Sequence, residues 1–243
     1  MTTTSRKFQG KIKVFLDGAI KEEMLEMSKL PVVKGFTTNP SLMRKAGVTD
    51  YKAYCLEMLK HLPNHPISFE VFSDDIAGME AQAQVIKTWG KNVYVKIPVI
   101  NSKGESMVPL IKKLSHAGVQ LNVTAIFDVE QTAAVCEALA GGAPSIVSVF
   151  AGRLADTGLD PIPVMKKAAE LCRKAGPQVE LLWASTREAY NVVEAEDCGC
   201  QIITAPKAVI EKVAGFNKKT PQEMSRETVM TFKKDSEASG FAL

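Results

Sequence analysis

Residues Asn92 to Val99 read Asn-Val-Tyr-Val-Lys-Ile-Pro-Val. A short run of β-branched and aromatic residues that ends at a proline is typical of a buried strand, and Lys96 stands at its C-terminal end. Lysine is almost never fully buried, because removing its ammonium group from water is costly or forces it to lose a proton. A neutral amine in a closed pocket attacks carbonyl carbon, as in Schiff-base enzymes. The alternative is a lysine whose charged end reaches solvent.

Similar apolar runs recur along the chain and alternate with stretches that carry apolar residues at helical spacing. Besides the strand that Lys96 closes, we expect strands over residues 12–16, 32–36, 67–72, 119–126, 145–150, 179–184 and 201–203. We expect helices over residues 20–30, 51–62, 75–89, 104–116, 129–139 and 164–174, and helices that open at Asn39-Pro40-Ser41, at Ser185-Thr186-Arg187 and at Pro206. The capping-box sequence Thr220-Pro221-Gln222-Glu223 predicts a last helix over about 220–235.

About eight strand–helix units of this kind predict a single (β/α)₈ barrel over residues 1–243, with an additional C-terminal helix. Strands covered by helices on their outer face should be nearly continuous apolar runs, with polar exceptions only for a reason. The exceptions fall near strand C-termini, which meet at one face of a barrel. They are Asp17, Asn39, Glu70, Lys96, Asn122, Thr124, Arg153 and Ser185. A doubly wound open sheet is the alternative, but it offers no single mouth for so many strand ends.

The composition narrows the class of protein. The chain has 243 residues, 46% of them hydrophobic, and a net charge of +3 that is too small and too dispersed to indicate a nucleic-acid or membrane-surface partner. The first ten residues are polar and lack the apolar core of a signal peptide, and no apolar run is long enough to span a bilayer. We therefore expect a cytoplasmic protein without membrane contact.

No metal or cofactor is expected. The histidines His61, His65 and His116 fall in helix or loop positions without carboxylates at metal-ligand spacing. The close pair Cys198 and Cys200 has no second pair to complete a zinc site. The chain also lacks a glycine-rich phosphate loop before a helix.

The expected cluster of strand ends suits carbon–carbon bond chemistry on a ketone. A lysine amine condenses with the ketone to an iminium ion, which accepts the electrons of the breaking bond, while a base takes a proton from a substrate hydroxyl. Asp17 and Glu70 are the available carboxylates, and Thr124 suits a bound water. Arg153 and Arg187 suit a phosphate group, since a guanidinium binds phosphate oxygens as a fork. We also expect a helix N-terminus beside Ser185, which favours anions.

Each of these residues has a simpler interpretation when it is taken alone. Each arginine alone is equally well a solvated surface residue, and Phe150 would ordinarily be core packing. Thr38 and Asn39 suit a turn and a helix cap, and Asp17 suits a cap for the helix that follows it. From the residues alone, the sequence predicts a Schiff-base lyase or transferase acting on a phosphorylated sugar.

Seven motifs resemble those of the transaldolase family, in the family's order, one near each of the first seven strand ends. They are Phe15-Leu16-Asp17, Gly35-Phe36-Thr37-Thr38-Asn39-Pro40-Ser41-Leu42, Ser68-Phe69-Glu70-Val71, Val95-Lys96-Ile97-Pro98, Leu121-Asn122-Val123-Thr124-Ala125, Ser148-Val149-Phe150-Ala151-Gly152-Arg153 and Ala184-Ser185-Thr186-Arg187. With the stretch from Gly199 to Pro206, the resemblance covers nearly the whole chain. It implies an (α/β)₈ barrel, no cofactor, and a Schiff-base lysine on the fourth strand.

The resemblance also implies roles for individual residues. Lys96 would form the Schiff base, Glu70 and Thr124 would transfer protons through a water, and Asp17 would act on the donor hydroxyl as acid or base. The implied substrate-binding residues are Thr38, Asn39, Asn122, Phe150, Arg153, Ser185 and Arg187. The implied reaction moves a dihydroxyacetone unit from fructose 6-phosphate or sedoheptulose 7-phosphate to an aldose phosphate in the pentose phosphate pathway.

Three alternatives stay open. The related fructose 6-phosphate aldolases resemble this pattern with Gln in place of Glu70 and Tyr in place of Phe150, so both positions here match the transaldolases. A sulfonated ketose would satisfy the same arginines, and Thr186 stands where the family usually has an aromatic residue. A non-catalytic scaffold barrel would be expected to have lost the lysine or its partners.

The compact subfamily that this chain resembles implies a homo-oligomer that assembles through the C-terminal helix.

Overall fold

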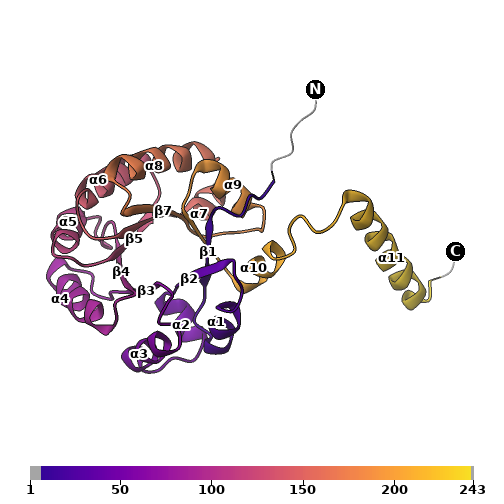
Figure 1. The fold of residues 1–243 in the computed structure, drawn as a ribbon, viewed down its shortest axis with the longest axis horizontal. Helices are drawn as coiled ribbons and strands as arrows, with labels where there is room; N and C mark the ends of the chain where they lie inside the picture. Colours follow the sequence, from indigo (N-terminus) through magenta and orange to yellow (C-terminus); the bar gives the residue numbers. More distant parts are fainter. Residues whose placement is uncertain (1–6, 242–243) are drawn as a thin grey trace.

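Eight parallel strands close into a barrel in the order of the sequence, which confirms the predicted (β/α)₈ fold (Figure 1). The computed structural model describes residues 7–241. The strands are β1 (Lys13–Asp17), β2 (Val33–Thr37), β3 (Ile67–Glu70), β4 (Val93–Pro98), β5 (Leu121–Ile126), β6 (Ser145–Val149), β7 (Val179–Trp183) and β8 (Ile202–Ala205). β1 and β8 pair in parallel over four residues of each strand, so the sheet has no free edge.

Helices cover the outside of the barrel, as Figure 1 shows. They are α1 (Lys21–Met27), α2 (Pro40–Lys45), α3 (Tyr51–His61), α4 (Ile76–Ile86), α5 (Val108–His116), α6 (Val129–Leu139), α7 (Ala151–Ala155), α8 (Ile162–Ala175), α9 (Asn191–Cys198) and α10 (Lys207–Val213), with a 3₁₀ turn over Lys87–Trp89. A last helix, α11 (Pro221–Ser239), follows them. Asp50, Asp75 and Asp128 cap α3, α4 and α6, and the side chain of each accepts the backbone N–H of the third residue of its helix.

One predicted helix start was wrong. The helix that was expected to open at Ser185-Thr186-Arg187 begins instead at Asn191, and residues 185–187 lie in a loop. The cause is the hydrogen bonding of Thr186, whose hydroxyl donates to the carbonyl of Thr204 at 2.7 Å and does not cap a helix. The short helix α7 was not expected, because five residues that include Gly152 carry no readable helical periodicity.

The interior of the molecule has two apolar layers. The larger layer lies between the strands and the helices, and includes Phe36, Phe69 and Trp183. The smaller layer fills the inside of the barrel and consists of Phe15, Ile146, Leu182, Ala184 and Ile202. A barrel of eight strands is just wide enough for side chains to fill, so this inner layer closes the barrel below its C-terminal mouth.

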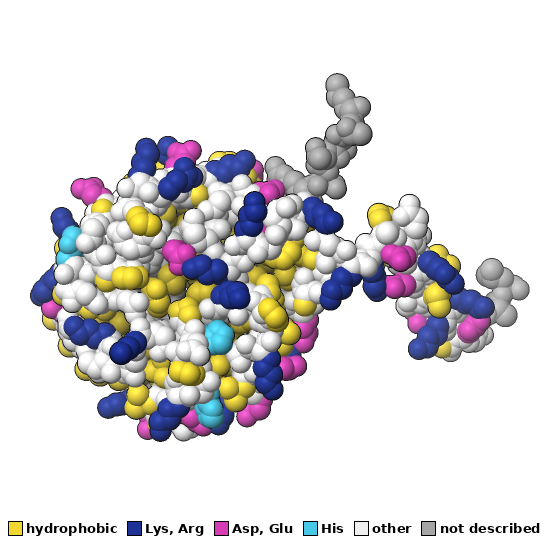
Figure 2. Space-filling model, in the orientation of Figure 1, with side chains coloured by type: hydrophobic (Ala, Val, Ile, Leu, Met, Phe, Trp, Pro, Cys, Tyr) yellow, Lys and Arg dark blue, Asp and Glu magenta, His cyan; other side chains and the backbone are white. Residues whose placement is uncertain are grey.

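The C-terminal helix α11 stands apart from the barrel (Figure 1 and Figure 2). Thr220 and Glu223 form the predicted capping box, and α11 extends to Ser239, beyond the expected end near residue 235. Every residue of α11 is exposed. Within the described residues 7–241, no helix combines the length and the apolar character needed to cross a membrane.

Gly35 permits the packing of the inner apolar layer. A Cβ atom at this position of β2 would lie 2.6 Å from the ring of Phe15, too close for any real contact. Gly35→Ala should therefore lower the free energy of unfolding by about 1–3 kcal/mol, the usual cost of overpacking a core. Urea unfolding followed by circular dichroism measures this change.

Gly18→Ala is the matched control for Gly35→Ala. A Cβ at Gly18 would meet only Leu16, at an ordinary contact distance of 3.5 Å. This control should change stability by about 0.5 kcal/mol or less. Equal stability of the two variants would contradict the role of Gly35 in admitting the Phe15 ring.

Candidate active site

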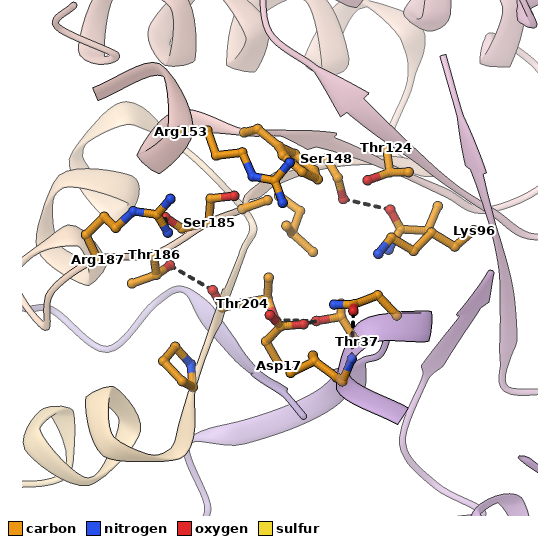
Figure 3. Close-up of a pocket in the computed structure, with 17 residues that line it drawn as sticks. Asp17, Thr37, Lys96, Thr124, Ser148, Arg153, Ser185, Thr186, Arg187 and Thr204 are labelled. Atoms are coloured by element: carbon orange, nitrogen blue, oxygen red, sulfur yellow. Dashed lines mark hydrogen bonds between the residues drawn. The ribbon is translucent and has the colours of Figure 1, made fainter. Parts of the chain in front are cut away.

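A cavity of about 300 Å³ opens at the C-terminal mouth of the barrel. Its walls carry nine of the eleven predicted site residues, namely Asp17, Asn39, Lys96, Asn122, Thr124, Phe150, Arg153, Ser185 and Arg187. Figure 3 shows Lys96 and Thr124 at one side of the cavity and Thr186 and Arg187 at the opposite side, with Asp17 between them. The two predicted residues that do not line the cavity are Thr38 and Glu70.

Lys96 is enclosed but not isolated from partners. The alternation of β4 turns Val95 and Ile97 into the apolar layer under the helices and Lys96 into the barrel, where its side chain is 11% exposed. Its Nζ atom lies 3.2 Å from Oε2 of Glu70 and donates a hydrogen bond of 3.1 Å to the carbonyl of Thr38. A buried lysine with these partners is placed to exchange its proton with a neighbouring carboxylate.

Glu70 and Thr38 thus contact Lys96 from outside the cavity lining. Glu70 stands directly opposite Lys96 in the register of β3 with β4. The hydroxyl of Thr38 donates to the carbonyl of Ser68 at 2.8 Å, so Thr38 faces Lys96 with its main-chain carbonyl. The structure therefore brings both residues to the lysine rather than to the open space.

Asp17 ends β1 and lines the cavity. The hydroxyl of Thr37 donates to its Oδ1 atom at 2.9 Å. Burial raises the pKa of Asp17, although Lys96, the hydrogen bond from Thr37, and Arg153 each act to lower it. The alternative role of Asp17 as a cap for α1 is wrong, since Ile20 occupies that N-cap position.

The two predicted asparagines are held by further hydrogen bonds. Nδ2 of Asn122 donates to Oγ of Ser68 at 2.9 Å, and Oγ of Ser148 donates to Oδ1 of Asn122 at 2.6 Å. Oδ1 of Asn39 accepts the backbone N–H of Leu42 at 3.0 Å and so caps α2, while its side chain also lines the cavity. Asn39 therefore fits both its interpretations, as helix cap and as cavity residue.

Thr124 presents a hydroxyl to the cavity. Its Oγ1 atom is buried and makes no hydrogen bond with any part of the chain that the structure describes, which leaves it available to a water or a substrate. Ala125, the next residue, has a φ of 60°, and the pairing of β5 with β6 shifts register at this point. This bulge is a local strain of the kind that often re-aims a side chain beside a functional site.

Arg153 and Arg187 lie toward the other side of the cavity. The guanidinium carbon of Arg153 lies 4.9 Å from the centre of the Phe150 ring, a cation–π contact that the sequence did not reveal. Nε of Arg187 donates to Asp156 at 2.9 Å, and Nη2 donates to the same carboxylate at 2.5 Å. Hydrogen bonding from Arg187 lowers the pKa of Asp156 and keeps it ionised.

Asp156 was missed from the sequence because its partner is 31 residues away. It occupies one edge of the Arg187 guanidinium, and Nη1 of Arg187 donates to the carbonyl of Ser185 at 3.0 Å. A guanidinium has five N–H donors, so two remain for an anion. The expected helix N-terminus at this place is absent among the described residues, so the positive charge on this side of the cavity comes from Arg153 and Arg187.

The loop that carries Ser185 packs tightly on α7. A Cβ atom at Gly152 would lie 1.6 Å from the carbonyl oxygen of Ser185, so only glycine fits there. Ser185 itself has a φ of 63°, an unfavourable conformation for a residue other than glycine. Strain and close approach together position the carbonyl that Arg187 contacts.

The chain was compared with known proteins. Residues 14–242 match the family model described as Transaldolase/Fructose-6-phosphate aldolase. A probable transaldolase of Dehalococcoides mccartyi is 38% identical over 199 residues, which are 82% of this chain and 88% of that protein. A probable transaldolase of Shouchella clausii is 34% identical over 204 residues, which are 84% of this chain and 90% of that protein.

Solved structures support the fold. The 3-hexulose-6-phosphate synthase of Salmonella typhimurium superimposes with a TM-score of 0.57 at 15% identity, covering 82% of this chain and 91% of that one. A monomeric dihydrodipicolinate synthase variant gives a TM-score of 0.57 at 10% identity, with 83% and 71% covered. Identities this low show the barrel alone, whereas the family match and the curated relatives show descent. The chain belongs to the transaldolase/fructose-6-phosphate aldolase family.

Proposed function

We propose that this enzyme is a cofactor-free transaldolase that moves a dihydroxyacetone unit from a ketose phosphate to an aldose phosphate through a Schiff base on Lys96. The observation that carries the proposal is the enclosed Nζ atom of Lys96 at the cavity, 3.2 Å from the carboxylate of Glu70. A carboxylate at this distance can take the proton that the lysine must lose before it attacks a carbonyl.

In the proposed reaction, the neutral amine of Lys96 adds to the ketone carbon, and loss of water gives an iminium ion. Asp17 takes the proton of the hydroxyl on the carbon at the far end of the breaking bond. The carbon–carbon bond breaks, that carbon becomes the aldehyde, and the electrons of the bond neutralise the iminium as an enamine. The aldehyde product leaves, and the enamine attacks the acceptor aldehyde while Asp17 returns the proton. Addition of water then releases the new ketose and restores Lys96.

The charges of the cavity favour a substrate with an anionic far end. Arg153 and Arg187 come from α7 and from the loop after β7, and Figure 3 places Arg187 across the cavity from Lys96. A guanidinium binds phosphate oxygens as a fork. This arrangement suits a sugar whose ketone reaches Lys96 while its terminal phosphate reaches the arginines. We further propose that the reaction belongs to the pentose phosphate pathway and takes place in the cytoplasm.

The Phe150 side chain favours transfer over release of free dihydroxyacetone. Phe150 lines the cavity and packs against Phe127, with ring centres 5.6 Å apart. It offers no hydroxyl that could relay a proton to the enamine, so the enamine would persist until an aldehyde acceptor arrives. A tyrosine at this position would supply such a hydroxyl.

Trapping of the intermediate tests the proposed function. Borohydride reduction in the presence of fructose 6-phosphate should leave a dihydroxyacetone-sized adduct on Lys96, identified by peptide mass spectrometry. The adduct should disappear when erythrose 4-phosphate is added. Lys96→Ala should abolish both adduct and turnover, because the covalent intermediate is lost, and turnover that survived this substitution would sink the mechanism.

Phe150→Tyr should raise the ratio of aldolase to transaldolase activity. Release of dihydroxyacetone from fructose 6-phosphate and transfer to erythrose 4-phosphate are measured in parallel assays of the same preparation. Phe127→Tyr is the matched control, since Phe127 touches Phe150 but is not part of the cavity wall. A ratio that stays unchanged in Phe150→Tyr would count against the assigned role of Phe150.

We further propose that the protein forms a homo-oligomer through α11. Successive residues of a helix are 100° apart, so Met224, Val229 and Phe232 share one side of α11 and Met230 lies on the other. These three side chains are 51%, 60% and 64% exposed. When exposed apolar side chains share one side of a helix, burying them against a second copy of the chain is favourable.

Phe232→Glu should therefore reduce the assembly to a smaller species in sedimentation velocity experiments. Met230→Glu introduces the same charge at a side chain that is 61% exposed, on the other side of the helix, and should leave the assembly intact. Equal sedimentation of the two variants and the parent protein would refute the role of this side of α11.

A further inference from the structure

Three side chains from adjacent strands form a hydrogen-bonded row beside the cavity. Oγ1 of Thr204 on β8 lies 2.5 Å from Oγ1 of Thr37 on β2, and Thr37 in turn donates to Oδ1 of Asp17 on β1 at 2.9 Å. β1 lies between β2 and β8 in the barrel. Figure 3 shows the three residues together below Arg153 and Ser185.

The direction of this row follows from a count of its protons. A threonine hydroxyl has one proton to donate, and an ionised carboxylate has none. When Asp17 is ionised, Thr37 donates its hydroxyl proton to Asp17. In the contact between the two threonine hydroxyls, Thr204 is therefore the donor. The row then runs from Thr204 to Thr37 to Asp17.

A second contact holds Thr204 in place. The hydroxyl of Thr186 donates to the main-chain carbonyl of Thr204 at 2.7 Å. Thr204 is 6% exposed and Thr37 is 4% exposed, so water does not compete freely for either hydroxyl. The backbone of Thr204 is therefore tied to the loop that carries Ser185 and Arg187, while its side chain points to Thr37.

We propose that Thr204 is a positioning residue. By donating to Thr37, the Thr204 hydroxyl orients the Thr37 hydroxyl towards Asp17, and so favours the ionised form of Asp17, which can accept a proton. The inference deepens the proposed function, since it rests on Asp17 as the acid and base. Hydrogen bonds in a row polarise one another, so the bond from Thr37 to Asp17 is stronger when Thr37 also accepts one. Thr204 acts through Thr37 and does not touch the carboxylate.

Several charged groups act on Asp17 besides the hydroxyl row. Lys96 from β4 and Arg153 from α7 favour its ionised form, whereas Glu70 from β3 opposes it. Thr37 is the hydrogen-bonding side chain that also lowers the pKa of Asp17. Removing a donor from the row should therefore move the protonation of Asp17 to higher pH while these three charges stay in place.

Titration of Asp17 tests the inference without any need for turnover. The midpoint of the Asp17 carboxyl is followed by carbon-13 NMR of protein labelled at aspartate, with the resonance assigned through Asp17→Asn. Thr37→Val should raise the midpoint by about one pH unit, the scale of one lost hydrogen bond to a carboxylate. Thr204→Val should raise it by about 0.1 to 0.3 unit, since cooperative strengthening is about 10–30% of one hydrogen bond.

Kinetics provide the second measurement. A general base must be ionised, so the acidic limb of the pH–rate profile should move to higher pH by the same amounts. Thr204→Ser keeps the hydroxyl and should therefore retain the parent midpoint and pH–rate profile. If Thr204→Val does not fold, Thr204→Ala takes its place. The borohydride adduct on Lys96 should form in all Thr204 variants.

The results that would overturn the role of Thr204 differ from those that would refute the proposed function. A midpoint in Thr204→Val equal to that of the parent protein, with a lowered melting temperature, would overturn the inference and leave Thr204 as core packing. Failure of the parent protein to form the Lys96 adduct would instead refute the proposed function, and the NMR midpoint would still decide the role of Thr204.

Discussion

Closure of the parallel sheet between β1 and β8 is the constraint on which the site depends. Pairing of Leu16 with Ala205 at one seam, and of Asp17 with Thr37 at the next, brings the ends of β8, β1 and β2 to one level. Each strand then has hydrogen-bonded neighbours on both sides, so a side chain can shift along the barrel axis only if the ladder shifts with it. Side chains that are more than 150 residues apart in the sequence, such as Thr37 and Thr204, meet because of this closure.

The barrel interior changes character along its axis. Its lower part is apolar and built around Phe15, which Gly35 admits, whereas its upper part carries the ionisable groups and hydroxyls. Charge in an enclosed space is tolerated only with partners. Lys96 and Glu70 partner each other, and Arg187 has Asp156. The upper interior is therefore a network in which the protonation of one group depends on the others.

Much of the fold could be predicted from the sequence, because each strand is an apolar run with a polar residue at its C-terminal end. The same reasoning placed Lys96 and Asp17 at one mouth. The prediction failed at Ser185-Thr186-Arg187, where the residue types suit a helix start but the Thr186 hydroxyl donates to the Thr204 carbonyl on β8. Asp156 and the row from Thr204 to Asp17 could not be predicted, since their partners are distant in the chain and the facing of a strand-end threonine depends on the barrel register.

The apolar layer beneath the cavity bears on how the proposed substrates would reach Lys96. Leu182 and Ala184 belong to that layer, Phe150 packs against it, and all three line the cavity, so the cavity has an apolar floor and opens at the C-terminal mouth. In the proposed transfer, the first aldehyde would leave by this mouth before the second enters by it. In the proposed cycle, the dihydroxyacetone unit would stay bound to Lys96 between the two aldehydes, in a cavity that is open at its mouth.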